Sequence, residues 1–185
     1  MALVFHLSVK LKIMANNHGE IENLTHEEAI EKMQELVEHN SICLFTTQIT
    51  DSPLHTRPMG TQNVDDEGNF WFLSADDSDK NSEIMEDSQV QLFYSNPSAA
   101  EFMSVYGYAS VSRDKNKIDE LWNPIAKAWF KDGKDDPRIT LIKVTPEEAY
   151  YWDTKSNKMV SMIKILASMV SGKTMDDGVQ GKMTI

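Results

Sequence analysis

Residues 54–74 contain two extended segments joined by a short turn, and this arrangement constrains the fold more than any other part of the chain. The first segment, Leu54–Val64, is followed by Asp65-Asp66-Glu67-Gly68 and then by Phe70-Trp71-Phe72-Leu73. An acidic, glycine-containing turn between two extended runs is typical of a β-hairpin, whose strands are antiparallel. The preceding apolar and β-branched run, Ile42–Thr47, extends the pair to a three-stranded antiparallel meander.

The rest of the chain continues this mixture of strands and short helices. Thr25 and Glu28 form a capping-box pattern at the start of a predicted helix, and Asp114 and Asn123 are expected to cap two later helices. Further strands are predicted over residues 89–94, 102–111, 139–144 and 149–152, and a further short helix over 79–86. Gly107 predicts a bulge or a close backbone approach inside its strand. Because short turns connect most strands, we expect a mainly β fold, a small closed antiparallel barrel with flanking helices.

We expect a single folded domain over residues 25–155, between two segments of different character. Residues 1–24 are polar near their end and are interpreted as a loose N-terminal extension. Met14 begins a sequence that resembles a native start, so residues 1–13 are hypothesised to be an added segment. Residues 156–185 are predicted to hold a C-terminal amphipathic helix and a tail.

The charge balance narrows the choice of partners. The chain has 18 Lys and Arg against 29 Asp and Glu, a net charge of −11, which disfavours binding to nucleic acid or to an anionic membrane surface. No run approaches the roughly 20 apolar residues of a membrane span. The single cysteine, Cys43, lies in an apolar run and cannot form an internal disulfide, which is compatible with a reducing compartment. We expect a cytoplasmic protein. The cysteine and histidine spacings predict no metal site.

Two cations frame the hairpin and the loop that follows it. Arg57 is one of three arginines, and a guanidinium can donate two parallel hydrogen bonds to a phosphate. It precedes Pro58, which lacks a backbone donor and therefore indicates a strand edge, a bulge or a ligand-facing position. Lys80 follows a loop rich in Ser and Asp that leads into a short helix, whose first N–H groups attract anions. We therefore predict a phosphate site beside an apolar wall. The alternative is a solvated strand-edge arginine, with the loop aspartates capping the helix.

These residues, together with several later ones, resemble the general stress protein 26 family, within the pyridoxamine 5′-phosphate oxidase-like, flavin-binding split-barrel superfamily. The resemblance covers roughly residues 25–153. The matching segments, in chain order, are Arg57-Pro58-Met59, Phe70-Trp71-Phe72-Leu73-Ser74, Lys80, Val105-Tyr106-Gly107-Tyr108-Ala109, Leu121-Trp122, Trp129-Phe130 with Gly133 and Asp136-Pro137, and Tyr151-Trp152-Asp153.

The resemblance implies a six-stranded antiparallel split β-barrel that forms a homodimer, with FMN bound at the subunit interface. It implies that Arg57 and Lys80 hold the FMN phosphate with help from Ser74, and that Pro58 and Met59 lie along the isoalloxazine ring. The resemblance further implies wall and backbone contacts to the cofactor from Trp71, Phe72 and Leu73. It assigns closure of the cleft to Trp122 or Trp129, contributed by either subunit.

The function that this resemblance implies is that of an FMN-binding stress-type protein. Its activity would be that of a flavin-dependent oxidoreductase on an unidentified small molecule, and no side chain stands out as a catalytic acid, base or nucleophile. Pyridoxamine phosphate oxidases carry Arg and His after a C-terminal Trp, whereas neither residue follows Trp152 here. The alternatives are a pyridoxine or pyridoxamine 5′-phosphate oxidase with an altered substrate site, a non-catalytic binding module, and a barrel that binds deazaflavin or haem.

Overall fold

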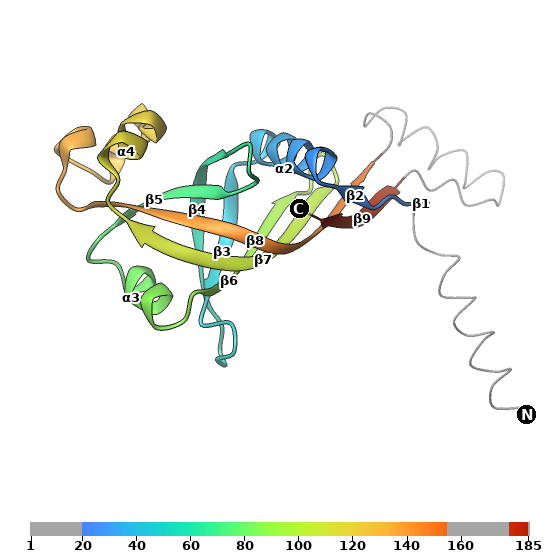
Figure 1. The fold of residues 1–185 in the computed structure, drawn as a ribbon, viewed down its shortest axis with the longest axis horizontal. Coiled ribbons are helices and arrows are strands. Elements are labelled where there is room, and N and C mark those ends of the chain that lie inside the picture. Colours follow the sequence, from blue (N-terminus) through green and yellow to red (C-terminus); the bar gives the residue numbers. More distant parts are fainter. Residues whose placement is uncertain (1–19, 155–177, 185) are drawn as a thin grey trace, which may run out of the picture.

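The computed structural model describes residues 20–154 and 178–184, and six of their strands form a closed antiparallel barrel (Figure 1). These strands are β3 (Ile42–Thr47), β4 (His55–Val64), β5 (Phe70–Ala75), β6 (Gln89–Asn96), β7 (Glu101–Ser112) and β8 (Ile139–Thr154). Their order is β8-β5-β4-β3-β6-β7, and an additional β7–β8 pairing closes the ring. Every pairing in this ring is antiparallel. The predicted mainly β fold with an antiparallel barrel is therefore confirmed.

The barrel interior is filled by alternate residues of each strand. Phe70 and Phe72 of β5 are fully buried, and the ring of Phe72 meets that of Phe45 edge to face, with centroids 5.2 Å apart. Helix α2 (Glu27–His39) adds Met33 and Leu36 to the same core, because its apolar residues recur at helical spacing. This helix lies across one side of the barrel (Figure 1).

The predicted capping box of α2 is wrong. The helix begins at Glu27, and its N-cap residue is His26, which makes no side-chain capping bond. Thr25 instead belongs to β2 (Leu24–Thr25), where it pairs with Thr184. The ladder with β9 (Gly178–Thr184) therefore determines the backbone before the helix, and His26 donates its N–H to the Thr184 carbonyl at 2.6 Å.

The other short helices flank the barrel. Helix α3 (Asp79–Glu86) has the predicted bounds, and it lies at the end of the barrel opposite β1, β2 and β9 (Figure 1). Asp114 caps α4 (Lys115–Leu121), and Asn123 caps the 3-10 helix η1 (Pro124–Ala128), both through side-chain bonds to backbone N–H groups. Gly133, which has a φ of 69°, begins a separate 3-10 helix, η2 (Gly133–Asp135).

The two strands predicted over 139–152 are one continuous strand, β8. Its pairing with β7 shifts register between Tyr106 and Gly107, which confirms the predicted bulge. A Cβ on Gly107 would lie 2.3 Å from the Thr145 carbonyl oxygen, so the close backbone approach is confirmed as well. Pro146 lies opposite Gly107, and its missing N–H falls at this irregularity, where the ladder tolerates it.

The end of β8 carries three strands that the sequence patterns did not predict. Strand β9 pairs antiparallel with β8, and the two-residue strands β1 (Glu20–Ile21) and β2 pair parallel with β9. Residues 20–24 were expected to be loose, and pairing with β9 orders their backbone. The C-terminal helix predicted within 156–185 falls in a part of the chain outside the described residues. None of the described helices is long and apolar enough to cross a membrane.

Candidate functional site

Strands β4 and β5 pair along only part of their length, and this divergence creates the candidate site. The paired stretch begins where Val64 lies opposite Phe70 and ends where Thr61 lies opposite Phe72. The register shifts within it, between Thr61 and Asn63. Nearer the start of β4, residues 55–60 pair with β3 and with no other described strand. One edge of β4 therefore faces the α3 end of the barrel without a ladder partner.

Pro58 fits this unpaired edge. Thr61 donates its N–H to the Ser41 carbonyl at 2.8 Å, so the main-chain groups of Thr61 face the β3 side. Because these groups alternate along an antiparallel strand, those of Pro58 and Gly60 face away from β3. The residue that lacks an N–H thus lies where no ladder bond is made, as its sequence context predicted. The Gly60 carbonyl accepts from the Gln62 side chain at 2.9 Å.

Arg57 is held at this edge by two polar side chains. Its Nη1 donates to Thr47 Oγ1 at 2.6 Å, and its Nη2 donates to Glu83 Oε2 at 2.8 Å. The side chain is 26% exposed, so the guanidinium is neither buried in the core nor free in solvent. A guanidinium has five N–H donors, and these two bonds leave three for a ligand.

Lys80 lies in the first turn of α3, near Arg57. Burial and, next, the Arg57 charge lower the pKa of Lys80, so two cations share one partly shielded region. Within the part of the chain that the structure describes, Lys80 has no side-chain hydrogen bond or ion pair. The α3 N-cap, Ser78, makes no side-chain bond to the helix N–H groups. The arrangement offers two positive charges and an uncapped helix start, which are the components of an anion site.

Glu83 is a residue of this cluster that the sequence patterns missed. It accepts from Thr47 Oγ1 at 2.5 Å, from the His55 ring at 2.9 Å and from Arg57. Burial raises the pKa of Glu83, but the hydrogen bonds from these three residues outweigh it and hold the pKa at about 2. Glu83 is therefore ionised at neutral pH. Its spacing of three from Lys80 on a predicted helix was the one available signal that both residues share a face.

Ser74 lies beneath this cluster rather than on its surface. Its hydroxyl, on a residue only 2% exposed, donates to Asn81 Oδ1 at 2.9 Å and lies 3.0 Å from Ser78 Oγ. Asn81 in turn donates to Thr140 Oγ1 at 2.9 Å, and Thr140 donates to the Ser74 carbonyl. This buried network joins β5, β8 and the start of α3, and thereby holds Lys80 in place. The sequence patterns missed Asn81 and Thr140.

The remaining predicted residues divide between the two faces of their strands. Pro58 is exposed, whereas the half-buried Met59 packs against the main core. On β5, Phe72 is a core residue, while Trp71 and Leu73 point to the opposite face and pack against the smaller cluster beneath α4. Phe72 was predicted to contact the cofactor, and because its side chain lies in the core, only its backbone is available to a ligand.

The indole groups lie on the α4 side of the hairpin. Trp71 donates its ring N–H to Asp65 at 2.7 Å, and the Lys117 ammonium lies 5.0 Å from its ring centroid. Trp122 packs on Phe130, with ring centroids 6.3 Å apart. Trp129 is 69% exposed on the segment after η1, which leaves its ring available for a further contact.

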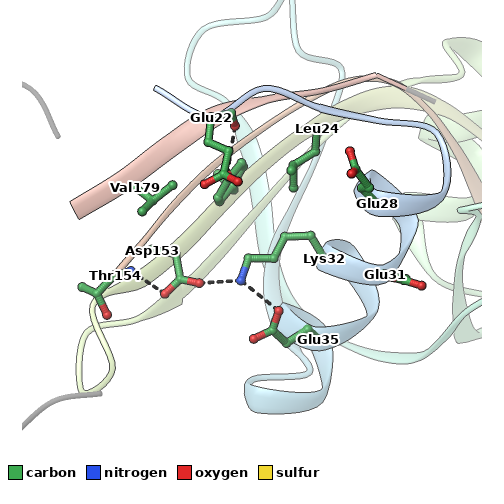
Figure 2. A pocket seen from close by; sticks show the side chains of 10 residues that line it. Glu22, Leu24, Glu28, Glu31, Lys32, Glu35, Asp153, Thr154 and Val179 are labelled. Carbon is green, nitrogen blue, oxygen red and sulfur yellow. Dashed lines mark hydrogen bonds and ion pairs between the residues drawn. The ribbon is translucent and has the colours of Figure 1, made fainter. Parts of the chain in front are cut away.

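A hollow of about 310 Å³ lies elsewhere, between α2 and the β8–β9 end (Figure 2). The ammonium group of Lys32 donates to Asp153 at 2.5 Å and to Glu35 at 2.8 Å. Burial lowers the pKa of Lys32, but these two bonds outweigh it and raise the pKa overall. The complete lining is Glu22, Leu24, Glu28, Glu31, Lys32, Glu35, Tyr151, Asp153, Thr154 and Val179. With five carboxylates against one lysine, the hollow is unsuited to a phosphate, and it contains none of the predicted site residues.

The described residues contain no group of three or more His, Cys, Asp or Glu side chains that could hold a metal ion. Cys43 is buried, and burial raises the pKa of its thiol to about 12, which makes it a poor nucleophile.

The closed six-stranded antiparallel barrel defines a protein of the split-barrel class. The chain belongs to the pyridoxamine 5′-phosphate oxidase-like family, whose profile matches residues 28–176. The expected resemblance to general stress protein 26 is thus confirmed at the level of the family and of the structural neighbours.

Two curated proteins are similar in sequence. Protein bli-3 of Neurospora crassa is 24% identical over 157 residues, which are 80% of this chain and 75% of bli-3. General stress protein 26 of Bacillus subtilis is 28% identical over 61 residues, which are 33% of this chain and 43% of that protein.

Solved structures are similar over a larger share of the chain. A putative general stress protein 26 from Jannaschia has a TM-score of 0.70 and 22% identity, covering 84% of this chain and 97% of its own, which establishes the fold. The general stress FMN/FAD binding protein from Xanthomonas citri has a TM-score of 0.61 and 26% identity, covering 70% and 92%.

Proposed function

We propose that this protein binds FMN, with Arg57 and Lys80 holding the phosphate. The observation that carries the proposal is the pair of cations at the uncapped start of α3. Arg57 retains three N–H donors, and the Arg57 charge contributes to the lowered pKa of Lys80. A phosphate between them would relieve this repulsion. Ser74 assists indirectly, because its buried network holds the start of α3.

The neighbouring surfaces suit the rest of a flavin. A flavin needs an apolar wall and main-chain donors and acceptors near its redox edge. The unpaired edge of β4 offers main-chain groups, and Pro58 and Met59 lie on this strand. The backbone of Phe72 and the side chains of Trp71 and Leu73 border the hairpin, and Trp122 or Trp129 would close the site. The FMN/FAD binding protein of Xanthomonas citri, 26% identical, supports a flavin as the ligand.

Bound FMN would supply electron or hydride transfer, and the protein would bind, orient and shield it. We therefore propose a flavin-dependent oxidoreductase that acts on a small molecule. No Arg or His follows Trp152, and this disfavours a vitamin B6 phosphate as the substrate. A single buried thiol is compatible with the reducing cytoplasm, where we propose that the protein acts.

The test is the absorption and fluorescence spectrum of the purified protein, before and after FMN is added. We expect a flavin spectrum that stays with the protein through gel filtration, and quenching or a shift of flavin fluorescence on titration. A protein that remains colourless at high FMN concentration would contradict the proposal and favour a non-catalytic binding module.

We also propose that the protein is a homodimer with FMN at the subunit interface. The outer face of the barrel carries exposed apolar side chains, in a chain of strongly acidic composition. Leu44 of β3 is 50% exposed and lies between Pro58 of β4 and Phe93 of β6 in the sheet register. An apolar surface of this kind is typical of an interaction face. It includes Pro58, and therefore adjoins the candidate flavin site.

Leu44→Asp is expected to convert the dimer into a monomer, because two aspartates would be buried at a self-complementary interface. Sedimentation velocity would show the loss of mass, and FMN titration should show weaker binding. Ile21→Asp is the matched control, since Ile21 is 67% exposed on β1 at the far end of the molecule. A wild-type protein that sediments as a monomer would rule out the dimer.

A further inference from the structure

Glu83 connects the start of α3 to two strands of the barrel. One carboxylate oxygen accepts from Thr47 and Arg57, and the other accepts from the His55 ring. The side chain is 13% exposed, and both oxygens are engaged. Thr47 also accepts from Arg57, so Glu83, Thr47 and the guanidinium form a closed triangle of hydrogen bonds. This triangle determines which N–H groups of Arg57 remain available.

The same carboxylate opposes an anion at Arg57. A phosphate bound to the free N–H groups would share one guanidinium with Glu83, which places two negative groups within a few ångströms of each other. At such distances, unit charges near a protein surface repel by an amount large enough to change affinity at least about tenfold. Arg57 and Lys80 supply two positive charges, and Glu83 is one of three carboxylates, with Asp77 and Asp79, whose charges act on Lys80. A phosphate monoester carries nearly two negative charges at neutral pH, so these carboxylates oppose it.

We propose that Glu83 sets the affinity of the phosphate site: it orients Arg57 and at the same time weakens the hold on a doubly charged phosphate. This inference rests on the proposed function, because it takes the Arg57–Lys80 pair to be the phosphate anchor. Its consequence is a phosphorylated ligand that is bound in a defined orientation and yet exchanges. A purely structural ion pair would make Glu83 helpful or neutral for binding, so the two roles predict opposite effects.

Glu83→Gln separates orientation from charge. The amide keeps the size of the side chain and an oxygen that can accept from Arg57 and Thr47, but it removes the negative charge. We expect the variant to bind FMN about tenfold more tightly at low ionic strength, with a smaller gain at high salt, because salt screens the repulsion. Riboflavin lacks the phosphate, so its affinity should stay unchanged.

Glu86→Gln is the matched control. Glu86 lies on the same helix and is exposed, and its carboxylate accepts from Gln48 rather than from Arg57. Its neutralisation changes the net charge equally, so an equal gain in this variant would overturn the inference. Equal or weaker binding of FMN by Glu83→Gln, in a variant that unfolds at the same urea concentration as the wild type, would overturn it too.

Inorganic phosphate keeps the inference testable if the protein binds no flavin. Failure of the wild type to bind either FMN or riboflavin would overturn the proposed function alone. In that case, thermal unfolding with increasing inorganic phosphate tests Glu83 directly. A larger rise of the melting temperature in Glu83→Gln than in the wild type and Glu86→Gln would support the inference, and equal rises would overturn it.

Discussion

Arg57→Ala is expected to weaken FMN binding by a factor of about ten to one hundred, because a hydrogen bond to a charged group contributes roughly 1.5–3 kcal/mol. The protein should remain folded, since Glu83 keeps its bonds to Thr47 and His55 when the guanidinium is removed. Fluorescence titration with FMN and with riboflavin would measure the effect. Riboflavin binding should change little, because Arg57 is assigned to the phosphate.

Lys80→Ala is expected to have an effect of the same size, and the double variant should lose more than either single variant. Arg113→Ala is the matched control, because it also removes one positive charge. Arg113 donates to Asp76 at 2.7 Å and to the Pro137 carbonyl, and among the described residues it forms no hydrogen bond or ion pair with β3 or β4. Unchanged FMN titrations for both the Arg57 and the Lys80 variants would remove the phosphate assignment.

Gly107→Ala should be the most destabilising of the simple substitutions that we consider. Its Cβ would lie 2.3 Å from the Thr145 carbonyl oxygen and 2.9 Å from Pro146 Cα, both of which are backbone atoms. Backbone cannot rotate away as a side chain can, so β7 and β8 must separate at the bulge. We expect a loss of roughly 3 kcal/mol in the free energy of unfolding, measured by urea denaturation.

Gly60→Ala provides the comparison within the same barrel. A Cβ on Gly60 would meet only the Gln62 side-chain amide at 3.7 Å, an ordinary contact. Its effect on the free energy of unfolding should therefore stay within about 0.5 kcal/mol. Similar losses in the two variants would show that the close approach at Gly107 does not limit stability.

Local sequence patterns were sufficient to predict the elements that neighbouring residues in the chain determine. The hairpin was predicted from its turn residues, α3 from its flanks, and the bulge from Gly107. Pro58 was predicted to lie at a strand edge, a bulge or a ligand-facing position, and it lies on the unpaired edge of β4, since a missing donor constrains pairing wherever the residue lies. The proximity of Arg57 and Lys80 was also anticipated, and their role as a phosphate anchor stays a prediction.

Features that depend on distant pairing could not be predicted in this way. In strand β9 the alternate residues Val179, Gly181 and Met183 are buried, but the glycine weakens the sequence pattern that would predict a strand. The two-residue strands β1 and β2 have no periodicity at all. Glu83 belongs to the candidate site because α3 packs beside β3 and β4. The spacing of residues along the chain does not predict this packing.

The partial pairing of β4 with β5 has a consequence for how such a protein can change during evolution. In the proposed site, the groups along the unpaired edge belong to the peptide backbone, which every residue except proline supplies in full. Mutation can therefore change most of the side chains on this edge and leave these main-chain groups in place. The structure from Jannaschia, which is 22% identical and has a TM-score of 0.70, shows that the fold itself persists through such a change of side chains.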